Sequence, residues 1–126
     1  MWAIVGLIFV AIAAASEAVM DIIQFHYEES VFAKRNPNFW NPAISWDNKY
    51  EKGEPKLGPR FLGSTSIFVM FTDAWHLFKS LRTFSLFSAM FFVSLPNPNT
   101  ILVLVVIYRI YYGLIFTVFY NKIFKK

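Results

Sequence analysis

Long runs of apolar residues divide the chain into four candidate helices, at residues 1–25, 61–78, 84–95 and 100–120. A helix that crosses a bilayer needs about 20 mostly apolar residues, so the first and last runs are long enough to span. The second run also qualifies, although polar residues interrupt it. The third is short unless its helix begins near Leu81. The hydropathy pattern therefore predicts a chain built from membrane-spanning helices.

We expect an all-α, polytopic integral membrane protein that forms a single helical domain over residues 1–126. Four transmembrane helices are the first interpretation, with approximate bounds at 1–27, 61–80, 81–95 and 100–121. An alternative has three, with residues 61–95 forming one kinked or partly re-entrant unit. The stretch LPNPNT at 95–100 ends whatever helix precedes it, because closely spaced prolines and asparagines do not continue a helix.

One long polar segment, residues 28–60, separates the first two predicted helices. Its prolines, glycines and mixed charges exclude a long helix, but aromatic residues including Trp40 and Trp46 are spaced through it. Aromatic rings of this kind settle at the head-group level of a membrane. We interpret the segment as an interfacial loop, with His26 and Glu28 at its start; the alternative is a lid over a site between the helices.

Composition supports the membrane assignment and excludes several classes of site. Of 126 residues, 56% are hydrophobic and only 16% are charged, which leaves too little polar surface for a soluble domain of this size. The chain has no cysteine, so disulfides and thiolate metal sites are excluded. The formal net charge of +4 is not gathered into a basic stripe, so we expect lipid rather than nucleic acid as its partner.

The N-terminal run resembles the apolar region of a secretory signal peptide, but no basic segment precedes it. We therefore expect a retained first helix and an integral membrane location without a cleaved signal peptide. Basic residues fall almost equally on the two sides of the predicted helices, so the positive-inside rule does not orient the chain.

Ionisable residues inside the apolar runs fall at similar depths. If the polar loop marks one membrane face, Glu17 and Asp73 each lie about 15 Å below it at 1.5 Å per residue, with His76 slightly deeper. Arg109 lies near the middle of the last run. Charges are costly against lipid, so we expect these side chains to face one another near the middle of the bilayer.

Helical periodicity adds Asp21 to this predicted cluster, because it shares one face of the first helix with Glu17. Asp73 and His76 likewise share a face by their spacing of three residues. Lys79 and Arg82 are expected to point away, toward the opposite interface. The predicted buried polar cluster is thus Glu17, Asp21, Asp73, His76 and Arg109.

Three functions fit such a cluster. The first is an ion network that fixes helix packing or docking, in a subunit or accessory component of a larger membrane complex or in a homo-oligomer. The second is a metal-dependent membrane enzyme, in which Glu17, Asp73 and His76 hold a divalent ion such as Mg²⁺ or Mn²⁺ and Arg109 clamps a lipid or other phosphate-containing substrate. The third is proton or ion translocation by an oligomer. The sequence carries no haem, flavin or nucleotide motif.

The stretch EAVMDIIQFHYEES at residues 17–30 resembles a motif of bacterial diacylglycerol kinases. The resemblance implies that Glu17 matches the metal-associated glutamate of that family and Asp21 the aspartate that follows it. The catalytic glutamate and the asparagine of that family would fall on Val10 and Ala13, which are apolar here, and a Lys-Asp signature that follows the motif is missing. We therefore do not assign the chain to this family.

Overall fold

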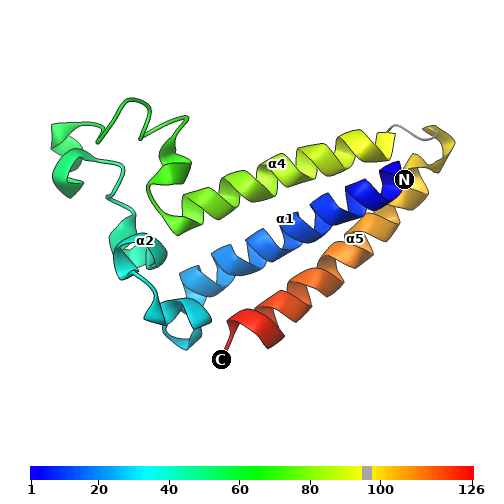
Figure 1. Ribbon diagram of the computed structural model, residues 1–126, viewed down its shortest axis with the longest axis horizontal. Coiled ribbons are helices and arrows are strands. Elements are labelled where there is room, and N and C mark those ends of the chain that lie inside the picture. The colour runs from blue at the N-terminus through cyan, green and yellow to red at the C-terminus, as the bar shows by residue number, and fades with distance from the viewer. Residues whose placement is uncertain (95–97) are drawn as a thin grey trace.

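The computed structural model describes residues 1–94 and 98–126, and within these ranges the chain is helical with no strands (Figure 1). Long helices form at Trp2–Phe25 (α1), Ala74–Ser94 (α4) and Ile101–Val118 (α5). A π-helical segment at Phe119–Phe124 (η7) continues α5 toward the C-terminus. The predicted all-helical fold is confirmed.

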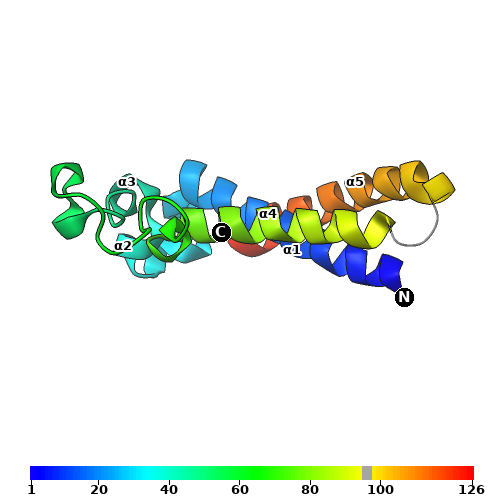
Figure 2. The same cartoon turned by 90° about the horizontal axis from the view of Figure 1, so that it is seen from above.

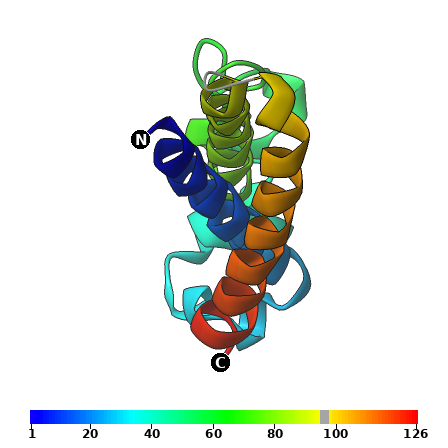
Figure 3. The same ribbon diagram turned by 90° about the vertical axis from the view of Figure 1, so that its right-hand side faces the viewer.

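Helix α1 lies between the other two long helices and packs on both, whereas α4 and α5 scarcely contact each other (Figure 1). The chain reverses direction between α1 and α4 and again between α4 and α5, so α5 runs the same way as α1. Figure 2 shows the segment between α1 and α4 gathered beyond one end of the long helices, and Figure 3 shows the three long helices viewed from the opposite end.

Small residues on α1 allow this close packing. Its buried positions include a glycine, three alanines and a serine, which are Gly6, Ala13, Ala14, Ala18 and Ser16. Ala89 is a buried small residue on α4. Small side chains let helix backbones approach one another, which is the main route to tight packing between helices in a membrane. Gly6 and Ala13 of α1 and Ser85 and Ala89 of α4 are all buried, in agreement with this role.

The segment between α1 and α4 folds into a cap over one end of the bundle. It contains short 3₁₀ helices and two single-turn α-helices, Pro37–Trp40 (α2) and Pro42–Ser45 (α3). Each α-helical turn begins with a proline, and the asparagine before it accepts a hydrogen bond from a backbone N–H two residues later. This is the usual arrangement at a helix N-terminus, so the local sequence explains both turns.

Aromatic rings join this cap to the ends of all three long helices. Trp40 stacks on Phe32 with ring centroids 4.5 Å apart and also meets Phe78 of α4 at 5.9 Å. Phe32 contacts Phe124 of η7 at 5.2 Å. Beneath these rings lies a buried cluster on α1 and α4 that includes Ile22, and the cap is therefore a packed part of the fold.

The predicted helix at 61–80 and its boundary with 81–95 are wrong. Residues 61–73 form turns and a short 3₁₀ helix, Val69–Phe71 (η5), and α4 begins only at Ala74 and runs through position 80 without a break. Gly63 has a φ of 82°, which is incompatible with an α-helix. The predicted helix end at residue 95 lies outside the described residues, as do residues 95–97 of the break predicted at 95–100.

Two helical stretches in the described part of the chain are long and apolar enough to cross a membrane: α1 and the continuous segment Ile101–Phe124, each of 24 residues. This test rests on length and composition, and a signal sequence or the core helix of a soluble protein can also meet it. The structure thus supports a membrane location in general terms, while the predicted four-span topology is not confirmed.

The contact between Gly6 and Tyr108 tests the packing of α5 on α1. A Cβ atom at Gly6 would lie 2.9 Å from Cζ of Tyr108 and closer still to its hydroxyl oxygen, which donates a 2.7 Å hydrogen bond to the carbonyl of Ala3. We expect Gly6→Ala to lower the free energy of unfolding by about 1–3 kcal/mol, as overpacking of a tight contact does. Thermal or denaturant unfolding in detergent measures the change.

A matched control is Gly113→Ala on α5, where the added Cβ would lie 3.6 Å from Nη1 of Arg109, an ordinary contact distance. That variant should be neutral or slightly stabilising, because alanine favours helix more than glycine. Tyr108→Phe removes the obstructing hydroxyl and should recover part of the stability lost by Gly6→Ala. Equal stability of the two alanine variants would show that α5 does not pack on α1 as described.

Candidate functional site

The predicted polar cluster is divided into two groups at different depths. Gln24 of α1 meets Trp75 of α4 through a 2.9 Å hydrogen bond, and Glu17 of α1 meets Arg82 of α4 at 3.2 Å. This antiparallel register places Glu17 about 13 Å along α4 from Asp73, at 1.5 Å per residue. Glu17 therefore does not join Asp73 and His76, and the expectation of a single cluster at one depth is wrong.

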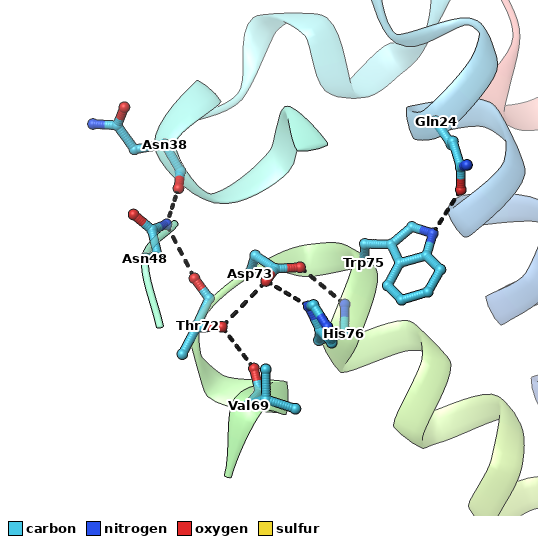
Figure 4. Close-up of polar contacts among 8 residues, drawn as sticks. All are labelled: Gln24, Asn38, Asn48, Val69, Thr72, Asp73, Trp75 and His76. Carbon is cyan, nitrogen blue, oxygen red and sulfur yellow. Dashed lines mark hydrogen bonds and ion pairs between the residues drawn. The ribbon is translucent and has the colours of Figure 1, made fainter. Parts of the chain in front are cut away.

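The first group surrounds Asp73, which directly precedes α4 and is only 2% exposed (Figure 4). One carboxylate oxygen accepts a 2.9 Å hydrogen bond from the backbone N–H of His76. The other lies 2.7 Å from Nδ1 of the His76 ring and accepts a 3.1 Å bond from the hydroxyl of Thr72. Asp73 thus acts as the N-cap of α4 and holds the imidazole in a defined orientation.

The cap segment is tied to the same point. The side-chain amide of Asn48 donates a 3.1 Å hydrogen bond to the backbone carbonyl of Thr72 and a second bond to the carbonyl of Asn38, as Figure 4 shows. Further along, the buried hydroxyl of Ser64 donates a 2.7 Å bond to the carbonyl of Lys49. These contacts join distant parts of the cap to the residues just before α4, which fixes where that helix begins.

The second group is an ion pair between the helices. Nη1 of Arg82 lies 3.2 Å from Oε1 of Glu17, and both side chains are about one-third exposed. Sequence reasoning missed Arg82, because a helix assumed to start near residue 61 placed it at the opposite interface. The spacing between Asp73 and Arg82 could have revealed this pair, because a helix that starts after Asp73 places position 82 at the depth of Glu17.

Polar atoms around this ion pair lack partners. Nε of Arg82 and the hydroxyl of Ser85, one turn further along α4, are buried and form no hydrogen bond within the described part of the chain. Buried polar groups without partners are costly and do not stabilise the contact between α1 and α4. The Glu17–Arg82 pair and close packing therefore hold this region together.

Arg109 does not join the ion pair. Within the described ranges, no carboxylate lies within the 4.0 Å salt-bridge limit of its guanidinium. The guanidinium carbon of Arg109 lies 6.0 Å from the centroid of the Tyr112 ring. Arg109 is exposed, and it lines a cavity of about 270 Å³ together with Glu17 and Asp21. The structure therefore places Arg109 near the predicted acidic residues without direct pairing.

A second cavity, of about 400 Å³, opens where α4 and α5 diverge. Its walls are mostly apolar and include Val10, Met90 and Val105, and Glu17 and Arg109 also line it. We refer to this space, lined by residues of α1, α4 and α5, as the α4/α5 groove. The groove therefore combines largely apolar walls with the exposed side chain of Arg109.

The remaining predicted interfacial residues lie in or beside the cap. His26 follows α1 and lies 3.6 Å from the carboxylate of Glu29, and its ring meets Tyr120 edge-on. Trp40 is part of the packed aromatic layer, whereas Trp46 and Glu28 are exposed. Burial, with a smaller contribution from the charge of Glu28, raises the pKa of the Tyr27 phenol.

The predicted metal-ligand set is not assembled. Among the described residues, no group of three or more His, Cys, Asp or Glu side chains is placed to hold a metal ion. Glu17 pairs with Arg82, and Asp73 pairs with His76 at a different depth. The combination of Glu17, Asp73 and His76 therefore does not form a metal site here.

No protein-family model, curated protein sequence or solved structure matches this chain.

The ion pair between α1 and α4 can be tested by removing its cation. Arg82→Leu leaves Glu17 without its partner between the helices, and we expect a loss of about 1.5–3 kcal/mol, the usual worth of a hydrogen bond to a charged group. Glu17→Gln in the same chain should recover part of this loss. Arg109→Leu is the comparison, and it should change unfolding in detergent by less than Arg82→Leu. The reverse order would mean that Glu17 pairs with Arg109.

The N-cap of α4 gives a second test. Asp73→Ala removes the acceptor for the N–H of His76 and should cost about 0.5–2 kcal/mol of stability, whereas Asp73→Asn keeps a capping oxygen and should cost less. Hydrogen exchange measured by mass spectrometry should show faster exchange at the start of α4 in the alanine variant. Unchanged exchange there would contradict the assignment of Asp73 as the cap.

Proposed function

We propose that the chain is an integral membrane subunit, in which α1, α4 and α5 span the bilayer and the α4/α5 groove receives a transmembrane helix of a larger complex. The proposal is carried by one observation: Arg109 lies at mid-helix on an exposed face, with no carboxylate in salt-bridge range among the described residues. A transmembrane arginine without a partner is unfavourable in lipid, by at least about 2.5 kcal/mol on insertion scales.

A retained first helix is part of this proposal. Helix α1 supplies most of the buried core and is the element on which α4 and α5 both pack. Without it, α4 and α5 would have almost no contact with each other, and Arg82 would lose its carboxylate partner. These contacts favour α1 as a permanent part of the folded protein over a cleaved signal sequence.

The depth of Arg109 favours a protein helix as the occupant of the groove. Arg109 lies about 12 Å along α5 from Ile101 at 1.5 Å per residue, and the helical segment continues beyond it to Phe124. Head groups stay near the membrane surface, whereas a carboxylate on a neighbouring helix can reach mid-depth. Polar residues within a membrane usually face another helix for this reason.

Charge and shape in the groove specify what the partner helix must carry. Arg109 requires an aspartate or glutamate at the same depth, because an arginine pairs best with a carboxylate through two parallel hydrogen bonds. The apolar walls, which include Leu86, Ala89 and Met90 of α4, suit the apolar side chains flanking that carboxylate.

The test places a photo-crosslinking amino acid at Val105, inside the groove, in the full-length chain in its native membrane. A matched position is Ile107 on the same helix, which is exposed and does not line the groove. We expect a crosslink to one transmembrane protein from position 105 and not from position 107. Resistance of the chain to carbonate extraction checks the membrane location separately.

Arg109 is then changed in the crosslinking protein. We expect Arg109→Leu to reduce the crosslink about 5- to 30-fold, which corresponds to about 1–2 kcal/mol for a polar contact between transmembrane helices. Arg60→Leu, a matched change in the cap, should leave it unaltered. Restoration by pairing Arg109→Asp with an arginine at the acidic position of the partner helix would support the proposal. A crosslink to a second copy of this chain, or one indifferent to Arg109, would overturn it.

A further inference from the structure

The outer face of α4 carries a third cavity, of about 440 Å³, away from the α4/α5 groove. It is lined by Val69 of η5 and by six residues of α4: His76, Lys79, Ser80, Thr83, Phe84 and Phe87. Neither the Glu17–Arg82 pair nor Arg109 belongs to it. It therefore represents a separate surface whose role does not follow from the proposed docking groove.

Polar and apolar residues occur in a fixed order along this cavity. Its basic side chains, His76 and Lys79, belong to the first part of α4, which begins directly below the cap. The aromatic residues Phe84 and Phe87 lie further along the helix and are both strongly exposed. The cavity thus changes from basic at the cap end to apolar near the middle of α4, as a phospholipid does from its phosphate to its acyl chains.

The two basic side chains are held at the cap end. The ammonium of Lys79 lies 4.9 Å from the centroid of the Trp75 ring, which is one turn closer to the cap. The predicted direction of Lys79 toward the opposite interface is therefore wrong, because its side chain turns back toward the start of α4. Long cationic side chains in membrane helices reach for the nearer interface in this way.

His76 presents one ring nitrogen to the cavity. Its Nδ1 is engaged by the carboxylate of Asp73 at 2.7 Å, so Nε2 is the atom available to a ligand. The ring is 23% exposed, and Asp73 is almost fully buried beneath it. The carboxylate on Nδ1 fixes the orientation of the imidazole ring at the edge of the cavity.

The charge around the cavity also favours an anion. Within the described part of the chain, no aspartate or glutamate is among the residues that line it. The nearest acidic group, Asp73, already accepts hydrogen bonds from Thr72 and His76. An incoming phosphate would therefore meet an ammonium, an imidazole and hydroxyl groups without an opposing carboxylate in the lining.

We propose that this cavity binds one anionic phospholipid, with its phosphate at Lys79 and His76 and an acyl chain against Phe84 and Phe87. The inference rests on the membrane location proposed above, but not on the docking of a partner helix. The phosphate lies at the level of the cap, where head groups are found, and the chain follows α4 into the bilayer. A soluble phosphate alone would leave the two exposed phenylalanines uncovered.

The experiment uses full-length protein that resists carbonate extraction, purified in detergent and studied by native mass spectrometry. The probes are phosphatidylglycerol, which is anionic, and phosphatidylcholine with the same acyl chains, which has no net charge. We expect the first phosphatidylglycerol to bind about tenfold more tightly than phosphatidylcholine. Lys79→Gln should remove most of this preference, because it removes the ammonium group. His76→Gln should weaken lipid binding, because it removes the imidazole that lines the phosphate end of the cavity.

Lys122→Gln is the matched control, because Lys122 is an exposed lysine near the end of η7 and does not line the cavity. That variant should keep the preference. Glycerol phosphate at millimolar concentration should not displace the lipid, because it has no acyl chain to cover Phe84 and Phe87. Circular dichroism and thermal unfolding confirm that each variant is folded.

Three outcomes would overturn the proposal: equal binding of the two lipids, an equal loss of preference in Lys79→Gln and Lys122→Gln, or displacement by glycerol phosphate. The last would identify a site for free phosphate rather than for lipid. A chain released by carbonate would instead overturn the membrane location itself, so the failure of that proposal is distinguishable from the failure of this one.

Discussion

The close approach of two helices to α1 is the constraint on which the rest of the structure depends. Gly6 leaves room for the ring of Tyr108, and Ala13 and Ala14 are small, fully buried residues of the same helix. Because α1 offers small surfaces to both neighbours, α4 and α5 pack on it without having to pack on each other. The groove between them, and the exposure of Arg109 beside it, follow from this arrangement.

The start of α4 is the second determinant, because it sets the register of every charge on that helix. Asp73 caps α4 and is joined through Thr72 and Asn48 to the folded segment above it. From this start, Arg82 falls opposite Glu17 while His76 stays below the cap. If the capping contacts fell one turn earlier in the sequence, Arg82 would be displaced from Glu17. The capping contacts and the ion pair therefore support the same register of α4 against α1.

The sequence was sufficient for the parts of the fold that have a strong periodic signal. The bounds expected for the first and last helices agree with α1 and with Ile101–Phe124 to within a few residues. The prediction from sequence failed at residues 61–73, where an apolar stretch forms turns instead of an α-helix. Gly63 adopts a positive φ there, which an α-helix does not allow. Apolar residues show what is removed from water, but they do not show which backbone hydrogen bonds form. The error in that helix start then displaced Asp73 and Arg82 in the predicted cluster.

Some charged residues of the bundle are paired within the chain and others are not. The paired ones contribute to folding, whereas the unpaired ones are available to bind a partner. Arg82 is paired with Glu17 inside the chain, so its charge contributes to the α1–α4 contact. Arg109 has no such partner in the described residues and faces the groove, whereas Lys79 lies on another face of α4, near the cap. A helix in the groove and a lipid beside Lys79 would contact different residues of α4, since the two cavities share none of their lining residues. Both could therefore bind at once, and α4 would separate a protein-facing surface from a lipid-facing one.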